Sequence, residues 1–459
     1  MDRTECDRQL TDGVPGPGRT HRPPHETIAA LKAYPYWWDT APRAWTLEAG
    51  TRSVDPLPGR VDVAVVGAGY TGLSAARQLA RSGASVAVLD RGRIGSGASS
   101  RNAGQVLTGL RLDAGTLVAT YGEPRARDLF EVSREAMSAL EQVVADEHIA
   151  CELDRPGHLQ AAAKPSHLRA FRDEQALLAR VFNHVVSIVD PSDQSTELGA
   201  RGYHGLLVDE ESRALNPAKY VLGLADAAKR AGAAVFEQTA VSRMTRRPNG
   251  WTIATARGDV DAGDVLVATN GYTDEAAPAL RRRLIPIGSY VICTAPLPDA
   301  LAAQLLPRRR MAFDSRHFLH YFRLTADNRL LFGGRAEFSG PTLESAKRAT
   351  TILHRAMIAM FPDLVATSID YAWSGHVAFA RDQMPHAGLL DNAFYAGGYA
   401  GHGVAMATYL GGLIARRIAG ERFEHPFFDD HFPAIPLYHG RPWFLPLVGL
   451  YYRFLDWID

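Results

Sequence analysis

Six consecutive residues of this chain have the types and spacing that hold a dinucleotide, the turn Gly67-Ala68-Gly69-Tyr70-Thr71-Gly72. In the pattern G-x-G-x-x-G, the first glycine permits a tight turn and the second lets a pyrophosphate approach the backbone. The third glycine lets the following helix pack closely on the preceding strand. Asp90 lies about 20 residues further on, where this pattern places an acid that accepts hydrogen bonds from a ribose. These residues therefore predict a dinucleotide site.

The elements expected around the turn would bring these residues together. Alternating apolar residues over 61–66 predict a buried strand, and apolar residues at helical spacing over 73–80 predict a helix. A second apolar run over 85–89 predicts a strand that ends at Asp90. The helix N-terminus would face the phosphates with its free N–H groups and the positive end of its dipole. This order of elements favours a bound dinucleotide over a βαβ unit that binds nothing.

The loop that follows Asp90, residues 91–105, is rich in small and turn-forming residues. Such a loop can bring backbone N–H groups and hydroxyls against a phosphate and a flat ring, and Arg101 and Asn102 add a charged and an amide donor. Ligands bind beyond the carboxyl ends of the strands in sheets of this kind. We therefore favour a ligand-binding loop over a solvated one.

The composition argues against several broad classes of protein. Lys plus Arg and Asp plus Glu number 50 each, so a general attraction to nucleic acid or to an acidic membrane is not expected. With 459 residues, 46% of them hydrophobic, the chain can fill one very large domain or two or three ordinary ones. Its three cysteines, Cys6, Cys151 and Cys293, predict neither a disulfide framework nor a metal site, and they fit a reducing, cytoplasmic compartment.

The ends of the chain have their own compositions. Residues 1–33 are mostly polar and rich in Pro and Gly, which predicts a flexible tail and not a secretory signal. The aromatic cluster at 34–39 is expected to pack on the domain surface or near a cavity. Residues 423–459 are rich in Phe, Pro, Trp and Tyr, and we interpret them as a packed extension in preference to a dimer contact or a membrane anchor. No stretch is long and apolar enough to span a bilayer.

Hydrophobic patterning predicts the scaffold between these features. It indicates helices over 123–150, 165–183, 216–232 and 341–361, and short strands within 151–164, 202–209 and 234–236. A buried strand over 265–268 then runs into Thr269-Asn270-Gly271. Small residues at a strand end fit a close approach to a cofactor and an ordinary strand-to-loop junction equally well.

Residues 284–337 are β-rich and predict an antiparallel sheet with a hairpin turn at Asp327-Asn328. The strands expected there cover 290–294, 317–324 and 330–333, and they carry His317, His320, Tyr321 and Arg323. Such side chains over a flat cofactor would make a substrate wall. Ordinary half-exposed sheet residues are the alternative.

The last third of the chain contains two further candidate segments. Residues 370–388 group Trp373, His376, Asp382 and His386. Residues 393–412 predict a second unit of strand, glycine-rich turn and helix, so a second helix N-terminus can face the ligand.

Taken in order, five motifs resemble the D-amino-acid oxidase-like (DAO) superfamily of FAD-dependent oxidoreductases: GAGYTG, GSGASSRNAGQ, ATNGY, WSGHVAFARDQMP and GYAGHGVAMA. YPYWWDTA before the first turn, SRNAGQ after it, and HYFRLTADNRLLFGG in the sheet resemble the γ-glutamylputrescine oxidase-like branch. The resemblance extends from about residue 34 to the end of the chain. It is specific for fold and cofactor, and it leaves the substrate open.

The resemblance implies an α/β fold of two domains. An FAD-binding Rossmann-like domain of the glutathione-reductase type would be assembled from residues 34–110, 200–275 and 370–422. A substrate domain with a large mixed β-sheet would comprise residues 111–199 and 276–369. Residues 423–459 would follow as the aromatic extension.

The resemblance also implies a set of FAD-contacting positions in this chain. Carried over residue by residue, they are Gly67, Gly69, Tyr70, Thr71, Gly72, Asp90, Arg91, Ser99, Ser100, Arg101, Asn102, Gly104, Gln105, Val241, Thr269, Gly271, Gly398, Gly401, His402, Gly403 and Val404. The helix that follows Gly403 would stabilise the anionic reduced ring through its dipole.

Two departures from sarcosine oxidase-type members bear on the cofactor and the substrate. Those enzymes attach FAD through a cysteine in the segment that corresponds to residues 373–382, where this chain has none, so non-covalent FAD is expected. They also carry a carboxylate-binding lysine just after the terminal GHG, where this chain reads Val404-Ala405-Met406. That difference argues against a sarcosine-like amino acid held in the same way.

The implied reaction is amine oxidation, in which a C–H bond beside nitrogen delivers a hydride to flavin N5 and the imine is then hydrolysed. The positions expected to aim the substrate are Tyr321, Arg323, His376, Tyr290 and His320. Arg323 would clamp a substrate carboxylate or pair with a neighbour in the sheet. His402 is expected to support its turn.

The partners implied are a small amine or amino acid and O₂. Two alternatives are an amino-acid dehydrogenase that passes electrons to a quinone or another carrier, and an FAD protein of specialised metabolism. No nucleic-acid partner, no metal and no membrane contact are expected, and the oligomeric state is left open.

Overall fold

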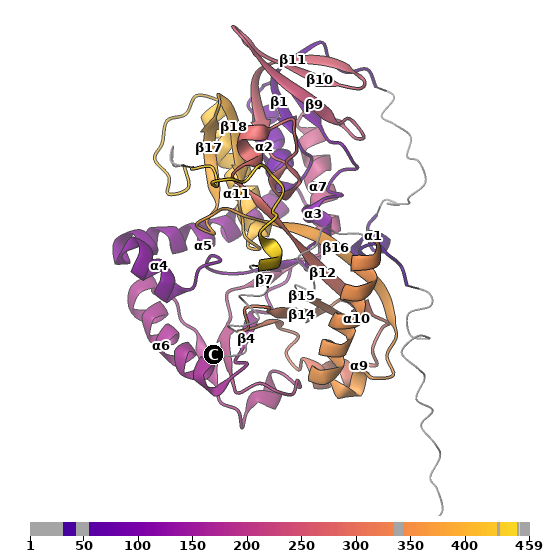
Figure 1. The fold of residues 1–459 in the computed structure, drawn as a ribbon, viewed down its shortest axis with the longest axis vertical. Helices are drawn as coiled ribbons and strands as arrows, with labels where there is room; N and C mark the ends of the chain where they lie inside the picture. Colours follow the sequence, from indigo (N-terminus) through magenta and orange to yellow (C-terminus); the bar gives the residue numbers. More distant parts are fainter. Residues whose placement is uncertain (1–30, 43–54, 335–342, 429–431, 448, 450–459) are drawn as a thin grey trace, which may run out of the picture.

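The computed structural model describes residues 31–42, 55–334, 343–428, 432–447 and 449, and two large sheets organise them (Figure 1). The first sheet carries the predicted dinucleotide turn. Its strand β1 (Arg60–Val66) lies parallel between β2 (Val86–Leu89) and β11 (Gly258–Val267). Both faces of β1 are covered: the side chains of Ala64 and Val65 are fully buried. This explains the nearly continuous apolar run, as expected for a parallel sheet.

The strand order of the first sheet is β17-β18-β11-β1-β2-β8, and β9 and β10 extend it from β11 as an antiparallel meander. Its other strands are β8 (Ala234–Phe236), β9 (Val241–Arg247), β10 (Gly250–Thr255), β17 (His386–Leu390) and β18 (Ala393–Gly397). The strands β8, β2, β1, β11 and β18 run parallel, so their carboxyl ends meet at one edge. That edge is where a doubly wound sheet binds its ligand.

Helices pack tightly beside this sheet: α2 (Tyr70–Arg81), α5 (Glu123–Asp146), α7 (Pro217–Arg230) and α11 (Gly403–Ile418). The helix α2 lies between α7 and α11, and 10 of its 12 residues are buried. Small residues make this possible. A Cβ atom on Gly411 of α11 would lie 2.4 Å from the carbonyl oxygen of Thr71, so the two helices approach at backbone distance.

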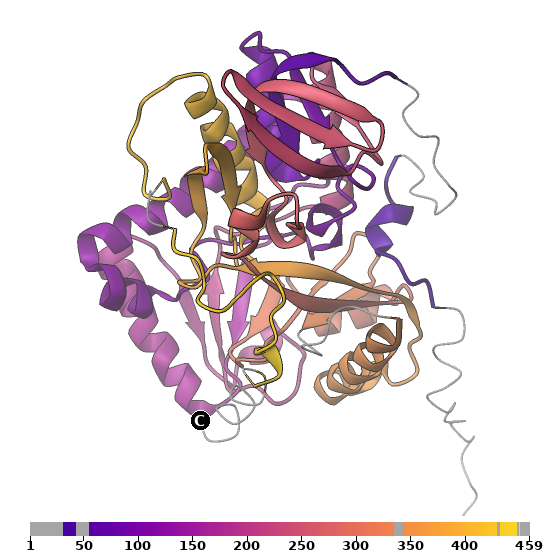
Figure 2. The ribbon, with the colours of Figure 1, turned by 45° about the horizontal axis from the view of Figure 1, so that its top comes forward.

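The second sheet is mixed and has the order β16-β12-β15-β14-β13-β4-β6-β5. Its strands are β4 (His158–Ala161), β5 (Ser187–Val189), β6 (Leu206–Asp209), β12 (Ile285–Thr294), β13 (Met311–Asp314), β14 (His320–Leu324), β15 (Leu330–Gly334) and β16 (Ile369–Phe379). The helix α10 (Leu343–Met360) covers one face of this sheet, as Figures 1 and 2 show. The architecture confirms the expected α/β fold with a Rossmann-like sheet and a large mixed sheet.

Shorter elements connect the two sheets. They are α1 (Tyr36–Asp39), α3 (Ala98–Arg101), β3 (Gln105–Val106), α4 (Ala114–Tyr121), α6 (Pro165–Phe182), β7 (Arg213–Ala214), α8 (Pro278–Arg281), α9 (Asp299–Leu305), and the 3₁₀ helices η2 (Gln194–Thr196), η3 (Asn270–Tyr272) and η4 (Pro362–Leu364). The side chains of Asp113 and Asn216 cap the N-termini of α4 and α7. Such caps satisfy N–H groups that the helix cannot pair.

Two segments join a different sheet from the one expected. Residues 202–209 and 370–379 fall in the part that the resemblance predicts to bind FAD, but β6 pairs with β4 and β5, and β16 pairs with β12, all in the second sheet. Residues 386–388, in contrast, begin β17 and belong to the first sheet. A short apolar strand has the same sequence pattern in either sheet, so only its hydrogen-bonding partner determines to which sheet it belongs. The expected hairpin between β14 and β15 is confirmed, with Asn328 at a φ of +60°.

The strand expected over 317–324 is shorter than the pattern indicates. The carboxylate of Asp314 accepts hydrogen bonds from the backbone N–H groups of Arg316 (3.3 Å) and His320 (3.1 Å). These bonds fold the intervening residues into a loop, and β14 begins only at His320. Local bonds from aspartate to the backbone compete with strand pairing in this way.

The described parts of both ends pack against the fold. In the aromatic cluster at 34–39, the side chains of Tyr36 and Trp37 are buried, whereas Tyr34 and Trp38 are half-buried and Asp39 is exposed. Near the other end, Phe432 stacks on His386 with ring centroids 4.0 Å apart, and the Tyr438 hydroxyl donates to the Leu284 carbonyl at 2.8 Å. Of the tail expected over 1–33, residues 1–30 lie outside the described residues, as do the last residues of the extension, whereas Lys32 is described and pairs with Asp39. None of the described helices is long and apolar enough to cross a membrane.

Candidate functional site

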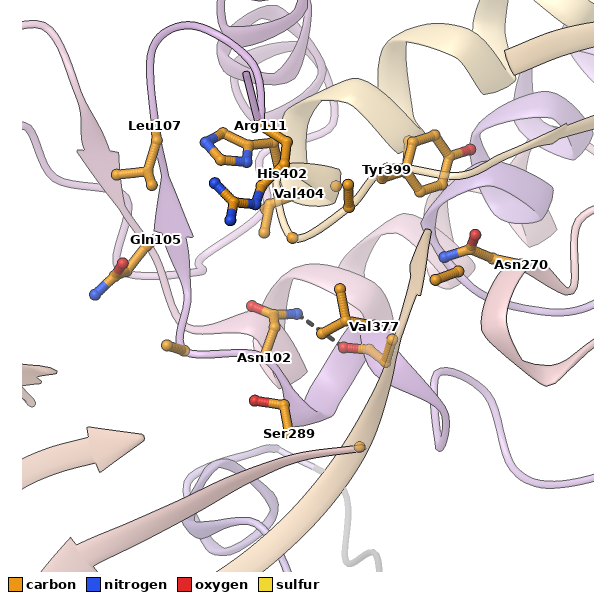
Figure 3. Close-up of a pocket in the computed structure, with 18 of the residues that line it drawn as sticks. Asn102, Gln105, Leu107, Arg111, Asn270, Ser289, Val377, Tyr399, His402 and Val404 are labelled. Atoms are coloured by element: carbon orange, nitrogen blue, oxygen red, sulfur yellow. Dashed lines mark hydrogen bonds between the residues drawn. The ribbon is translucent and has the colours of Figure 1, made fainter. Parts of the chain in front are cut away.

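A cavity of about 950 Å³ lies where the carboxyl edge of the first sheet meets the second sheet. Its wall includes the ends of β1 and β2, the first residues of α2 and α11, and parts of β12 and β16. In Figure 3, Asn102 and Gln105, the turn before α11 with His402, and Ser289 and Val377 of the second sheet all border the same space. This volume lies in the usual range for a cofactor or substrate pocket.

The three glycines of the first turn have the geometry that the motif requires. Gly67 has a φ of +109°, which favours glycine, and its N–H donates to the Leu89 carbonyl at 2.9 Å. A Cβ atom on Gly69 would lie 2.9 Å from Ser99 Oγ, and one on Gly72 would lie only 2.0 Å from the Gly67 carbonyl oxygen. Any side chain would therefore close the approach to the turn or push α2 off β1.

Asp90 stands at the end of β2 and lines the cavity. Its Oδ2 accepts the Ala68 N–H at 2.7 Å, and its Oδ1 accepts the Gly92 N–H at 2.7 Å. Burial raises the pKa of this carboxyl, although both N–H groups act in the opposite direction. Each oxygen keeps a second lone pair, so the side chain can accept ribose hydroxyls while it holds the turn.

The loop of residues 97–105 forms the next part of the wall. Asn102 fixes its shape, because Nδ2 donates to the Ala98 carbonyl at 3.0 Å and Oδ1 accepts the Gly104 N–H at 2.8 Å. Arg101 spans to the second sheet, where Nη1 donates to the Ser374 carbonyl at 3.0 Å. The loop residues that line the cavity are Gly97, Ala98, Ser99, Arg101, Asn102, Ala103 and Gln105, whereas Ser100 and Gly104 lie behind the wall.

A second helix N-terminus opens onto the cavity at the start of α11. His402 is the N-cap residue of α11, and no side chain caps this end. Asn270 Oδ1 accepts the Gly398 N–H at 3.0 Å, and the Tyr399 hydroxyl lies 2.6 Å from Thr71 Oγ1, so the two glycine turns are tied together. Asn270 therefore orients the second turn and lines the cavity, a role that the sequence pattern did not identify.

Two histidines of the wall are neutral near pH 7. Burial lowers the pKa of His402 to about 3, and burial also lowers the pKa of His376. Among the described residues, neither Nδ1 atom has a hydrogen-bond partner, and the same holds for Nε2 of Gln105. Polar atoms left unpaired in a wall are typical of a site completed by a ligand.

FAD fits this arrangement of residues. The N-termini of α2 and α11 carry no side-chain cap and open onto one cavity, where each can face an anionic part of a ligand. The expected positions Tyr70, Thr71, Arg91, Val241, Thr269, Gly401, Gly403 and Val404 also line the cavity. Gly72, Gly271 and Gly398 lie just behind the wall, where a side chain would meet neighbouring atoms at 2.0 to 3.3 Å.

Tyr321 and Ser289 belong to the part of the wall that the second sheet contributes. Their hydroxyls are 3.1 Å apart, and both residues line the cavity. Burial raises the pKa of Tyr321 to about 12, so this hydroxyl keeps its proton at physiological pH. It can therefore act as a donor to a ligand.

Three residues expected to aim a substrate do not line the cavity: Arg323, Tyr290 and His320. Tyr290 faces the core under α10, because successive strand residues point to opposite faces and its neighbour Ser289 takes the cavity side. His320 Nδ1 lies 3.3 Å from Asp314 Oδ2. The guanidinium of Arg323 is directed behind the 97–105 loop and donates to the Gly104 carbonyl at 3.0 Å. Of the two roles expected for Arg323, a substrate clamp or a pairing with a sheet neighbour, its position does not support the clamp.

The cavity extends into a chamber whose residues the sequence analysis missed. Thr108, Gln160, His184, Asp209 and Arg111 line it, and Figure 3 shows Arg111 beside His402. His184 Nε2 is 2.7 Å from Asp209 Oδ2, and Arg134 donates to His184 Nδ1 at 2.9 Å. Arginine can only donate, so the imidazole hydrogen must be on Nε2, directed at the carboxylate. No local motif marks these residues, which come from the strands β4 and β6 and from two separate loops.

Comparisons with known proteins agree with this geometry. The DAO family, described as FAD dependent oxidoreductase, matches residues 62–417. The chain is 34% identical over 400 residues to gamma-glutamylputrescine oxidoreductase of Escherichia coli, and the match covers 86% of this chain and 92% of that protein. It is 34% identical to a probable oxidoreductase OrdL of Rhizobium meliloti, over 84% of this chain and 90% of that one. The crystal structure of glycine oxidase from Geobacillus kaustophilus has a TM-score of 0.68 at 22% identity and covers 82% of this chain and 100% of that chain.

Proposed function

The chain belongs to the DAO family of FAD-dependent oxidoreductases, and from this premise we propose that it oxidises a carbon–nitrogen bond of a small amine, as a γ-glutamylputrescine oxidase-like enzyme. The family assignment confirms the resemblance read from the sequence. The amine, the electron acceptor and the individual site residues are parts of the proposal.

One observation carries the proposal: the cavity is continuous from the dinucleotide turn, past the 97–105 loop, to a polar chamber walled by the second sheet. FAD bound along the first part would supply a two-electron acceptor for a hydride. The chamber would then hold the substrate beside the acceptor. Two binding regions in one enclosure provide the proximity that such a transfer needs.

The residues of the chamber fit an amine that carries a second polar group. The side chains of His376 and His402, which also line the cavity, are neutral, so each can accept a hydrogen bond from the N–H of a neutral amine. Tyr321 can donate through its protonated hydroxyl. We assign the task of carboxylate recognition to Arg111 in place of Arg323, because Arg111 lines the chamber beside His402 (Figure 3).

The chemistry asks the protein to bind, aim and exclude water. Loss of a hydride from carbon and a proton from nitrogen turns the amine into an imine, and water then releases a carbonyl compound and a smaller amine or ammonia. The protein must bind the amine in its neutral form, because an ammonium nitrogen has no lone pair to stabilise the forming C=N bond. Neutral imidazoles in the wall suit this requirement better than imidazolium groups would.

The experiment that tests the function is an anaerobic titration. The purified yellow protein is mixed with amines, polyamine derivatives and amino acids in the absence of oxygen, and flavin absorbance is followed. Bleaching by a γ-glutamylated or similar carboxylate-bearing polyamine is expected. Bleaching by amino acids alone would instead favour an amino-acid oxidase or dehydrogenase, and no bleaching by any amine would overturn the proposal.

The electron acceptor is proposed to be O₂ and the compartment the cytoplasm. Admitting air after bleaching should restore the flavin colour and produce hydrogen peroxide in equal amount. If the reduced flavin is reoxidised slowly by air and quickly by a quinone, the enzyme is a dehydrogenase and not an oxidase.

The FAD is proposed to be non-covalent. The segment 373–382 contains no cysteine, and Cys151 and Cys293 are both buried outside the cavity wall. Burial raises the pKa of Cys151 to about 11, so it stays an unreactive thiol. Acid precipitation should release all of the flavin into the supernatant, and flavin retained on the denatured chain would contradict this part of the proposal.

A further inference from the structure

An N-terminal segment, residues 31–42 with α1, lies behind the 97–105 loop, on the side away from the cavity. We call it the N-terminal strap. Trp37 Nε1 donates to the Asn102 carbonyl at 2.9 Å, and Trp38 Nε1 donates to Ser100 Oγ at 2.9 Å. Neither tryptophan lines the cavity, whereas Asn102 does. The strap therefore contacts the loop on one side while the loop faces the cavity on the other.

A third tryptophan completes the set of donors. Trp373 of β16 donates through Nε1 to the Arg101 carbonyl at 2.8 Å. Three consecutive loop residues, 100 to 102, are thus each held by one indole N–H. The Arg101 guanidinium also lies over the ring of Trp38, 5.0 Å from its centroid. An indole N–H donates and cannot accept, so each bond also fixes the direction of the group that receives it.

Arg323 holds the end of the same loop. Its Nη1 donates to the backbone carbonyls of Gly104 at 3.0 Å and Leu215 at 3.1 Å, and the guanidinium lies 5.8 Å from the centroid of the Trp37 ring. Gly104 has a φ of +69°, and a Cβ atom there would lie 2.1 Å from the Leu215 carbonyl oxygen. The loop is therefore pressed between Arg323, the start of α7 and the strap.

The strap has its own anchors on the second sheet. The Tyr36 hydroxyl donates to Asp327 at 2.6 Å, at the hairpin between β14 and β15. The Tyr371 hydroxyl of β16 donates to Asp39 at 2.9 Å, and Lys32 pairs with the same carboxylate at 2.6 Å. Because these bonds do not involve the loop, removing one indole N–H leaves the strap in place. The effect on the loop can then be measured separately.

We propose that Trp37, Trp38 and Arg323 are positioning residues for the flavin ring, which act through the 97–105 loop from behind. They fix the carbonyls and the hydroxyl of residues 100–104, so that the opposite side of the loop meets the cofactor in one conformation. The inference rests on the proposed placement of FAD along this cavity. It gives Arg323 a role that differs from both roles considered in the sequence analysis, the substrate clamp and the pairing with a sheet neighbour.

The test compares two conservative variants of the holoenzyme. Trp38→Phe removes the indole N–H that reaches Ser100 and keeps an aromatic ring. Trp251→Phe is the matched control, because Trp251 lies in β10 away from the cavity and its Nε1 has no hydrogen-bond partner among the described residues. Both proteins are first compared with the wild type by far-UV circular dichroism, which shows that they are folded.

Three readouts then address the flavin directly: the rate of FAD release after dilution, the visible circular dichroism of the bound flavin, and its midpoint potential. Trp38→Phe is expected to release FAD about fivefold faster, the equivalent of one hydrogen bond, and to change the visible spectrum and the potential. Trp251→Phe should match the wild type in all three. Trp37→Phe should change the same three readouts as Trp38→Phe does, because it removes the hydrogen bond to the Asn102 carbonyl.

The outcomes separate this inference from the proposed function. If the folded Trp38→Phe and Trp37→Phe proteins both match the wild type in release, spectrum and potential, the positioning role is overturned while the FAD site stands. If Trp251→Phe changes the flavin as much as Trp38→Phe does, the effect is a general loss of packing and the inference fails. A wild-type protein that takes up no FAD would remove the proposed site itself.

Discussion

At the scale of single residues, burial sets the charge of the groups around the cavity. It keeps His376 and His402 neutral and keeps Tyr321 protonated. Asp209 behaves differently: burial alone would raise its pKa, but hydrogen bonds from His184 and Thr108 lower it overall, so it stays ionised. The wall therefore combines neutral donors and acceptors with charged side chains such as Asp209, Arg111 and Arg316.

The first prediction concerns Arg111. The variant Arg111→Gln is expected to raise the dissociation constant of carboxylate-bearing amines by at least about tenfold, because a charge-assisted hydrogen bond contributes roughly 1.5–3 kcal/mol. Stopped-flow reduction of the flavin at several substrate concentrations measures it. An amine of the same length without a carboxylate serves as the control substrate and should bind the variant and the wild type alike. An equal loss of affinity for both amines would show that Arg111 does not bind the carboxylate.

The second prediction follows from the pKa of His402, which is about 3 and therefore below the ordinary value near 6.5. The unfolded chain takes up a proton on this residue below pH 6.5, and the folded protein does not. Stability is unaffected above that pH and falls as the pH drops from 6.5 toward 3. At saturating FAD, the thermal midpoint of the wild type should fall more between pH 7 and pH 5 than that of His402→Asn, by the equivalent of roughly 2 kcal/mol. Parallel pH curves for the two proteins would contradict the depressed pKa.

At the scale of elements, the site depends on how closely α11 approaches α2. The first turn of α2 carries the dinucleotide turn, and the second glycine turn leads into α11. Gly411 lets the two helices meet at backbone distance. The tie between Tyr399 and Thr71 holds the same two elements at their ends. A change in the contact between α2 and α11 should therefore alter the binding of the cofactor.

The third prediction uses two adjacent glycines of α11. Gly411→Ala places a Cβ atom 2.4 Å from the Thr71 carbonyl oxygen, which must move, so we expect a loss of roughly 1–3 kcal/mol in stability and weaker FAD binding. Gly412→Ala meets its nearest atom only at 4.0 Å. It should be neutral or stabilising by up to about 1 kcal/mol, because alanine favours a helix. Thermal unfolding and FAD titration measure both, and equal behaviour of the two variants would refute the packing argument.

At the scale of the whole molecule, the cavity is shared by the two sheets. The first sheet supplies the glycine turns and Asp90, and the second supplies Tyr321, Ser289 and His376. Arg101 and Trp373 cross between them through the 97–105 loop. A ligand that fills this cavity would contact both sheets, and its binding should stabilise the protein as a unit.

The fourth prediction is that FAD stabilises the molecule more than FMN does. FAD at about 100 times its dissociation constant should add about 2.7 kcal/mol to the free energy of unfolding, which corresponds to a rise of roughly 3–6 °C in the thermal midpoint. FMN lacks the adenosine half that would reach Asp90 and Val241, so its effect should be clearly smaller. Differential scanning fluorimetry of the flavin-stripped protein measures both. Equal shifts would argue that the adenosine end of the cavity is not used.

The sequence predicted best those features whose residues lie close together in the chain. The turn 67–72 and Asp90 belong to one continuous βαβ unit, so spacing alone placed them together. The family motifs extended this to the 97–105 loop and the turn before α11. Side-chain direction was harder to predict on the second sheet. Tyr321 faces the cavity, whereas Tyr290 and Arg323 do not, because a single strand pattern does not say which face or which end meets the ligand.

The sequence by itself determined the cofactor class, the two helix N-termini that open onto the cavity and the α/β fold, because short segments with fixed spacing encode them. Only the tertiary structure decided the substrate chamber and the strap. Arg111, His184 and Asp209 come from separate elements, and Trp37 reaches Asn102 across 65 positions of the chain. The physical reason is that these residues come together only when the two sheets pack against each other. No local sequence pattern specifies which strands will be neighbours.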